Sequence, residues 1–273
     1  MGLRINQNIA AQNSYRNLTV TDGQMAKSLE KLSSGFRINR AADDAAGLSI
    51  SEGLRSQVGG LKVAVRNAQD GVSVVQTAEG ALTESHAILQ RMRDLAVQAA
   101  NGGSQDTNAQ AAANTEFQDL KLELTRISDT TKFGSQALLD GSYNGTFQVG
   151  ANSGETISVA VAQDFDAAGL GVGASVLTST AAAVTALGAV DTAITTVSTE
   201  RAKLGAKQNR LEHTINNLSV AIENLSASES RIRDTDMASE MVSFTRAQIL
   251  TQAGTAMLAQ ANQAPQGVLQ LLR

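Results

Sequence analysis

The sequence predicts a mainly α-helical fold, a long antiparallel helical bundle or coiled coil with one small β-hairpin region. Apolar residues recur at alternating spacings of four and three through residues 190–232, and a second register of this kind runs through residues 54–96. Such a register, sustained over several heptads, is typical of long helices that bury one seam against partner helices. Pro265 is the only proline among 273 residues, and because proline breaks helix interiors, its near absence permits long uninterrupted helices.

The register of residues 190–232 is the more regular of the two. At about 1.5 Å per residue, its helix would be roughly 65 Å long, which suits mechanical assembly better than an active-site cleft. The apolar stripe is broken only at Arg201, Gln208 and Glu229. We expect an outer seam formed by Leu211, Ile215, Leu218, Ile222 and Leu225.

The register of residues 54–96 has a weaker helix propensity. It includes Gly59, Gly60, Gly71 and Gly80, and each glycine costs about 1 kcal/mol relative to alanine in a helix interior. Packing against other helices must therefore hold this helix. Its His86 lies in the seam register, and we interpret it as a histidine satisfied between helices rather than as a catalytic group.

Both chain ends are expected to be helical but weakly apolar. Ser34-Gly35 would end the first helix at a left-handed glycine cap, and Asp43-Asp44 would cap the next helix. Segments with so few large apolar residues should become ordered only against each other or against neighbouring copies. The apolar residues that keep heptad spacing are Leu18, Met25, Leu29 and Leu32 near the N-terminus and Met237, Met241 and Phe244 near the C-terminus, and we expect them in the contact between the two ends.

The middle of the chain changes character. Residues 101–104 (NGGS) end a long helix, and the next helix has Phe117, Leu120, Leu124 and Ile127 on one face. The runs TFQV (146–149) and TISV (156–159) flank a turn cluster and predict a β-hairpin. We expect five segments: residues 1–40, the N-terminal helical end; 41–163, the N-terminal part of the helical bundle with the hairpin; 164–183, a flexible tip loop of variable sequence; 184–232, the C-terminal rod of the bundle; and 233–273, the C-terminal helical end.

Composition excludes several classes of function. The formal net charge of −4 argues against nonspecific nucleic-acid binding, and the absence of cysteine excludes disulfides and thiol chemistry. The N-terminal residues lack the apolar core of a signal peptide. No window approaches 18 apolar residues, so we expect no membrane-spanning segment.

No catalytic, cofactor-binding or metal site is expected. Asp43 and Asp44 have no nearby histidine or cysteine that would support a metal site. The run GLGVGA (169–174) fits a loose dinucleotide fingerprint but lacks the surrounding parallel-sheet pattern. Ser85 adjoins His86, yet neighbouring residues on a helix point in different directions. An enzyme is therefore the weakest of the hypotheses for this chain.

The two ends carry motifs that together resemble bacterial flagellins over most of the chain. At the N-terminal end these are LSSGFRIN (32–39), DDAAG (43–47), RNAQDG (66–71) and TAEGAL (77–82). At the C-terminal end they are NRL (209–211), SESRI (228–232), DTD (234–236), AQIL (247–250), QAGT (252–255), LAQANQ (258–263), PQ (265–266) and LLR (271–273).

The resemblance implies the function and the partners. Flagellins self-assemble into the extracellular flagellar filament for swimming motility. The resemblance implies that residues 1–40 and 233–273 pair as the two halves of an inner coiled coil around a narrow channel, and that residues 41–163 and 184–232 form an outer helical bundle. The flagellar export apparatus secretes them unfolded, and an export chaperone and a filament cap protein are further expected partners. The short segment at residues 164–180 suggests a minimal flagellin without large variable outer domains. A hook–filament junction protein of related architecture is the alternative.

One local match implies a further partner. The run LQRMRDLAVQ (89–98) resembles the flagellin segment that a vertebrate Toll-like receptor recognises. The matching positions are Gln90, Arg91, Leu95 and, on the next helix, Glu116. The same residues would also serve in helix packing.

Overall fold

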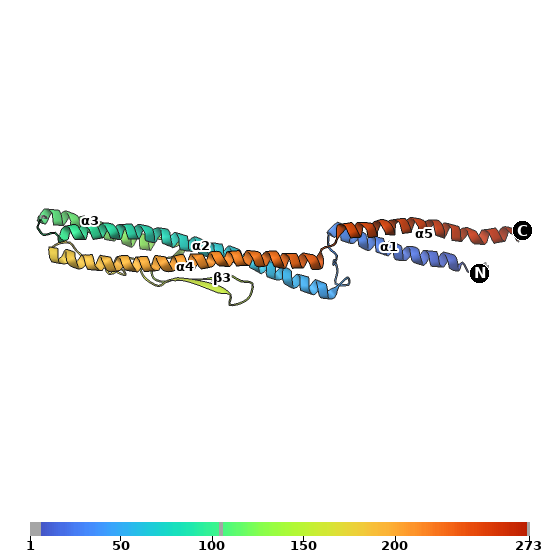
Figure 1. Ribbon diagram of the computed structural model, residues 1–273, viewed down its shortest axis with the longest axis horizontal. Coiled ribbons are helices and arrows are strands. Elements are labelled where there is room, and N and C mark those ends of the chain that lie inside the picture. Colours follow the sequence, from blue (N-terminus) through green and yellow to red (C-terminus); the bar gives the residue numbers. More distant parts are fainter. Residues whose placement is uncertain (1–6, 104–105, 272–273) are drawn as a thin grey trace. The chain divides into compact units, whose positions relative to one another are not determined.

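The computed structural model describes residues 7–103 and 106–271, with side chains described up to residue 263. It confirms the mainly helical fold (Figure 1). The helices are α1 (Ile9–Ser34), α2 (Ala45–Ala100), α3 (Thr107–Thr130), α4 (Thr180–Arg233) and α5 (Met237–Leu271), and the strands are β1 (Lys132–Phe133), β2 (Gln136–Ala137), β3 (Tyr143–Gln148) and β4 (Thr156–Val161).

The chain divides into two compact units. The terminal unit contains residues 1–56 and 224–273, and the central unit contains residues 57–223. The first part of α2 and the last part of α4 thus group with the terminal helices. Residues 1–6 and 272–273 of the expected inner segments lie outside the described residues.

In the central unit, α2, α3 and α4 run side by side with the hairpin (Figure 1). Their inward faces form one core, and all its fully buried members lie between Ala68 and Leu211. On α4 the buried positions include Val190, Val197 and Leu204, as the register predicts, but Ala193 rather than Ile194 is buried between them. A straight α-helix has 3.6 residues per turn, so its buried face drifts from a strict heptad.

Polar interruptions of the two registers, such as Glu79 and Arg201, form ion pairs between α2 and α4. Glu79 of α2 lies 3.5 Å from Arg201 of α4, and Arg93 of α2 lies 2.6 Å from Asp191 of α4. Polar pairs at the edge of an apolar seam favour one register over shifted alternatives. The interruptions therefore help to fix how α2 and α4 align within the central unit.

The hairpin is present and slightly longer than expected. β3 and β4 pair antiparallel, with Thr146 opposite Ser158 and Phe147 opposite Ile157. Alternate residues of β4 are buried, because successive side chains of a strand point to opposite faces. The two-residue strands β1 and β2 form a second small hairpin that the sequence pattern did not predict.

The sequence predicts a flexible tip loop at residues 164–183, but the loop ends before α4 and packs into the core. Phe165, Val172 and Leu177 are fully buried, and α4 already begins at Thr180. Asn114 of α3 accepts a hydrogen bond from the backbone N–H of Leu177 at 2.8 Å. The sequence pattern did not reveal this core segment. Its large apolar residues are scattered among glycines and alanines and follow neither a helical nor a strand period.

Close packing explains why α2 has a glycine at position 71. Gly71 is buried, and a Cβ there would lie 3.2 Å from Leu211 Cδ1 and 3.3 Å from Phe147 Cγ. The glycine therefore lets α4 and the hairpin approach α2 closely. By contrast, a Cβ at Gly80 would meet nothing within 4 Å.

One helix, α4, is long and apolar enough to cross a membrane by length and composition, with an 18-residue window of mean hydropathy 1.4. The expectation that no such segment exists is therefore too strict. A core helix has the same composition, and Ala186, Val190 and Val197 of α4 lie in the core. We assign α4 to the helical bundle on this basis.

Candidate functional site

In the terminal unit, α1 and α5 pack antiparallel along one face. Asn8 Nδ2 donates to the carbonyl of Ala261 at 2.7 Å, and Lys31 lies 3.7 Å from Glu240. A Cβ at Gly254 would lie 3.2 Å from Leu18 Cδ1, so the glycine permits close approach. Up to residue 263, the buried or half-buried positions are Ala11, Ser14, Leu18, Thr21, Met25, Ser28, Glu30, Lys31 and Leu32 on α1, and Glu240, Phe244, Ala247, Thr251, Gly254, Leu258 and Ala261 on α5.

Many large apolar side chains of these helices point away from that contact. The prediction placed Leu29, Met237 and Met241 in it, but they are 56%, 48% and 53% exposed. The contact uses small and polar residues at these turns, which leaves the larger side chains outside. The other exposed large hydrophobics are Ile9, Tyr15 and Val20 on α1, and Val242, Ile249, Leu250 and Met257 on α5.

The connection from α1 to α2 and the connection from α4 to α5 are joined by backbone hydrogen bonds. The backbone N–H of Thr235 donates to the carbonyl of Gly35 at 3.0 Å, and that of Arg37 donates to the carbonyl of Arg233 at 2.7 Å. The Arg233 guanidinium lies 4.8 Å from the Phe36 ring centroid and 2.6 Å from Glu52. These contacts hold the start of α5 next to the end of α1.

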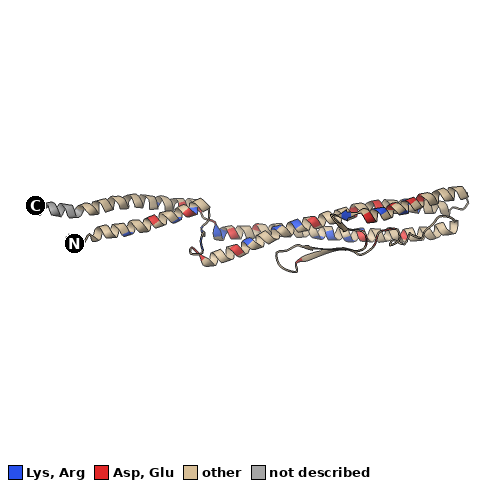
Figure 2. Ribbon diagram, turned by 180° about the vertical axis from the view of Figure 1, so that it is seen from behind, with Lys and Arg blue, Asp and Glu red and all other residues tan. Residues whose placement is uncertain are grey.

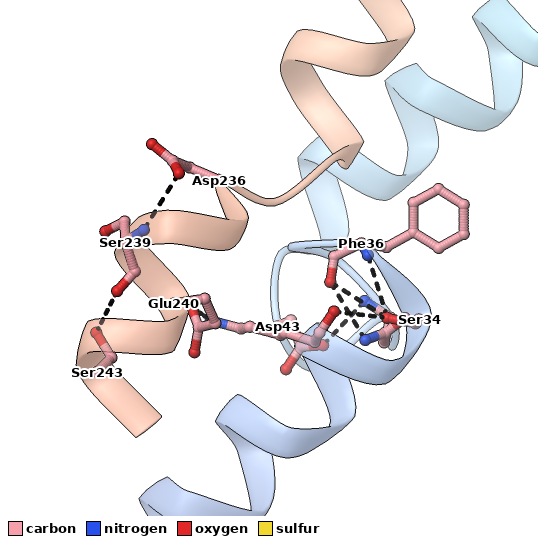
Figure 3. A network of polar contacts seen from close by, with 9 residues as sticks. Ser34, Phe36, Asp43, Asp236, Ser239, Glu240 and Ser243 are labelled. Atoms are coloured by element: carbon pink, nitrogen blue, oxygen red, sulfur yellow. Dashed lines mark hydrogen bonds and ion pairs between the residues drawn. The ribbon is translucent and has the colours of Figure 1, made fainter. Parts of the chain in front are cut away.

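Short polar contacts shape each connection (Figure 3). Gly35 has a φ of 76° and donates its N–H to the carbonyl of Lys31, which ends α1. Asp44 caps α2 by accepting from the N–H of Gly47, whereas Asp43 accepts from the N–H groups of Arg40 and Asn39. These backbone hydrogen bonds, Arg40 first, lower the pKa of Asp43.

The residues predicted for the outer seam differ in how deeply their side chains are buried. Leu211 is fully buried and Leu218 is nearly so. Ile215, Ile222 and Leu225 are half-buried. Leu225 belongs to the terminal unit and the other four to the central unit.

The receptor-like residues form a small polar surface over a buried leucine. Arg91 Nε donates to Glu116 Oε1 at 2.7 Å, and this carboxylate raises the pKa of Arg91. Gln90 is exposed and contacts the His86 ring at 3.0 Å. Leu95 is only 2% exposed, so its side chain supports this surface from within the core.

The groups considered for chemistry are occupied structurally. Ser85 is buried and donates its hydroxyl to the carbonyl of Ala81. Residues 169–174 follow an antiparallel hairpin rather than a parallel strand. Within residues 7–103 and 106–271, no group of three His, Cys, Asp or Glu side chains is placed to hold a metal ion.

Family models match both ends of the chain. The bacterial flagellin N-terminal helical region matches residues 5–144, and the bacterial flagellin C-terminal helical region matches residues 187–272. Together they cover more than half of the chain, including the helices that carry the exposed apolar faces.

Near-full-length relatives point the same way. A flagellin of Halalkalibacterium halodurans is 56% identical over 98% of this chain and 99% of its own length. A flagellin of Bacillus subtilis is 51% identical over 99% of this chain and 100% of its own length. The crystal structure of Bacillus cereus flagellin is 34% identical with a TM-score of 0.51, and the match covers 56% of this chain and 88% of that one.

These matches give no support to the hook–filament junction alternative. The small size of the chain fits a minimal form without large additional outer domains. The chain belongs to the bacterial flagellin family, the structural proteins of the extracellular flagellar filament.

Proposed function

We propose that this flagellin polymerises through the exposed apolar faces of α1 and α5, and that the two helices form the inner layer of the filament. The observation that carries the proposal is the row of large apolar side chains outside the α1–α5 contact, such as Tyr15 and Leu29 on α1 and Ile249 and Met257 on α5. Contiguous exposed apolar surface marks an interaction site in a soluble protein. Further copies of the chain would bury it.

Energetics support the same conclusion. Two paired helices with few buried apolar groups gain little from packing, and most helical stability in proteins comes from packing of an apolar face. We therefore expect the terminal helices to be disordered in the monomer and ordered in the filament. Limited proteolysis should trim both ends of the monomer but not of the filament, and equal protection in both forms would contradict this.

Deletion of residues 237–273 tests the role of α5. The central unit keeps its own core, so the truncated monomer should remain soluble and largely helical by circular dichroism. It should not sediment as polymer after seeding, whereas the full chain should. Filaments from the truncated chain would refute assembly through α5, and loss of all helicity would show that both units fold together.

Membership of the flagellin family is the ground for the proposed export partners. We propose that the flagellar export apparatus secretes the chain unfolded, that an export chaperone holds it beforehand, and that a filament cap protein guides its polymerisation. In a strain without the export apparatus, the chain should stay inside the cell. Normal secretion in that strain would contradict the proposal.

We also propose that a vertebrate Toll-like receptor binds the surface of Gln90, Arg91 and Glu116. Arg91→Ala should weaken receptor activation in a reporter-cell assay. Arg126→Ala is the matched control, because Arg126 forms a similarly exposed ion pair with Glu123 on α3. Equal responses to both variants would contradict a receptor role for Arg91. We assign no catalytic role to the chain.

A further inference from the structure

Charged residues are rare on α1 and α5, and most of α5 carries none (Figure 2). The seven charged residues of these helices are Arg16, Asp22, Lys27, Glu30, Lys31, Glu240 and Arg246. Glu30 pairs with Arg40 and Lys31 pairs with Glu240. In the described part of the chain the other four form no ion pair, and Asp22 is the one acid among them.

Asp22 and Arg246 each lie between two exposed apolar residues on one side of a helix. Asp22 lies seven residues from both Tyr15 and Leu29, a spacing that places all three on one side of α1. Arg246 lies four residues after Val242 and three before Ile249, so these three share one side of α5. The four flanking apolar side chains are 56–64% exposed.

The surface of α5 around this stripe has a depression. This depression of about 520 Å³ is lined by Met241, Val242, Thr245, Arg246, Ile249 and Leu250. The depression is large enough to receive an apolar side chain such as Leu29 of a second copy. Among the described residues that line this depression, Arg246 is the one that is charged, which fits an apolar stripe that contains one acid.

The two stripes cannot pair within one chain. Arg246 lines a cleft together with Gln24, Lys27 and Lys31 of α1. Asp22 is nine residues from Lys31, which at about 100° per residue places it roughly 180° around α1 from that cleft. The acid and the cation therefore lie on opposite edges of the α1–α5 pair.

We propose that Asp22 of one copy pairs with Arg246 of a second copy, where the stripe Tyr15–Asp22–Leu29 packs against the stripe Val242–Arg246–Ile249. A contact between two different surfaces of the same chain is heterologous, and it propagates when the rotation between copies does not close a ring. The pairing therefore supplies the head-to-tail contact that an open polymer requires. It rests on the proposed self-association and assigns the residues that direct it.

Charge reversal in the full chain tests this pairing, with elongation from preformed seeds followed by light scattering. Arg246→Glu and Asp22→Arg should each slow elongation at least about tenfold, because each juxtaposes like charges at the contact. The double variant restores opposite charges and should elongate within about threefold of the wild-type rate. Lys62→Glu and Asp70→Arg, exposed positions on α2, are controls matched in charge and should leave elongation unchanged.

A second combination tests specificity. Lys27 lines the same cleft as Arg246 but is already attracted to Asp43 of its own chain. Lys27→Glu should therefore fail to rescue Asp22→Arg. Wild-type elongation by either single variant, or a double variant no faster than the singles, would overturn the pairing while self-association stands. Failure of the wild-type chain to polymerise would overturn the proposed function and the pairing with it.

Discussion

The central and terminal units use the same helical pattern but bury very different amounts of it. In the central unit, α2, α3, α4, the hairpin and the segment before α4 contribute to one core. In the described part of the terminal unit, only Ile38 and Ala247 are buried hydrophobic residues. An apolar stripe therefore does not reveal by itself whether its partner lies in the same chain.

The difference assigns separate roles to the two units. Burial of apolar surface is the dominant favourable contribution to folding, so the central unit should fold as an independent body. The terminal unit keeps its apolar side chains available for other copies. Four predictions test this contrast, and they are ordered by the size of the expected effect.

The largest effect should come from a charge in the central core. Leu211 is fully buried, and Leu211→Asp should cost on the order of several kcal/mol, because an unpaired charge would be taken out of water. Leu29→Asp, at an exposed position of the terminal unit, should leave the monomer melting temperature unchanged but abolish seeded polymerisation. Calorimetry and sedimentation measure the two outcomes, and equal melting temperatures for the two variants would refute the contrast.

A smaller effect should come from one half-buried hydrogen bond. Asn114→Ala removes the acceptor for the N–H of Leu177 and should destabilise the monomer by about 1–2 kcal/mol. Asn8→Ala removes the terminal unit's bond to the carbonyl of Ala261 and should not change monomer unfolding. Chemical denaturation followed by circular dichroism compares them. A larger effect of Asn8→Ala would mean that the terminal helices stabilise the monomer.

The glycines of α2 sharpen the contrast between packed and open surface. Gly80→Ala should stabilise the monomer by up to about 1 kcal/mol, the usual helix-propensity gain. Gly71→Ala should lose that gain, because the new methyl group would press on Phe147 and Leu211. Thermal unfolding of both variants measures the difference. A stabilised Gly71→Ala variant would show that the hairpin can shift away from α2 without cost.

Periodicity was sufficient to predict the long helices, because it records which face of a helix is apolar. It could not predict the core residues Phe165 and Val172, which lie in a segment without regular spacing and depend on the three-dimensional path of the chain. It also misplaced Leu29 and Met241 in the α1–α5 contact, because alternative apolar stripes on a helix have the same period. Which stripe faces the partner helix is decided by small residues such as Gly254 and Ala247.

The smallest of the four effects should be the change in melting temperature at low pH, and it should depend on carboxyl groups of the central unit only. Hydrogen bonds from the backbone and then the side chain of Asn152 lower the pKa of Glu155 in the hairpin turn, and backbone N–H groups lower that of Asp43 in the terminal unit. A lowered carboxyl pKa contributes stability above the unfolded value, near 4.5 for Glu155, and this is lost as pH falls through the folded value. The melting temperature of the monomer should therefore fall below about pH 4.5, and Glu155→Gln should flatten part of that fall.

Asp43→Asn should leave the acid profile of the monomer unchanged, because the melting transition reports the central unit and Asp43 lies in the terminal unit. Thermal unfolding followed by circular dichroism between pH 3 and pH 7, a range that brackets the usual carboxyl pKa values of about 4, compares the two variants. Both side chains are fully exposed, so each difference should be a shift of a few degrees at most, as expected for surface positions. If Asp43→Asn flattened the profile as much as Glu155→Gln, the connection next to α1 would already be part of the folded monomer. The terminal unit would then be ordered before assembly, and the contrast between the two units would have to be redrawn at the α1–α5 contact.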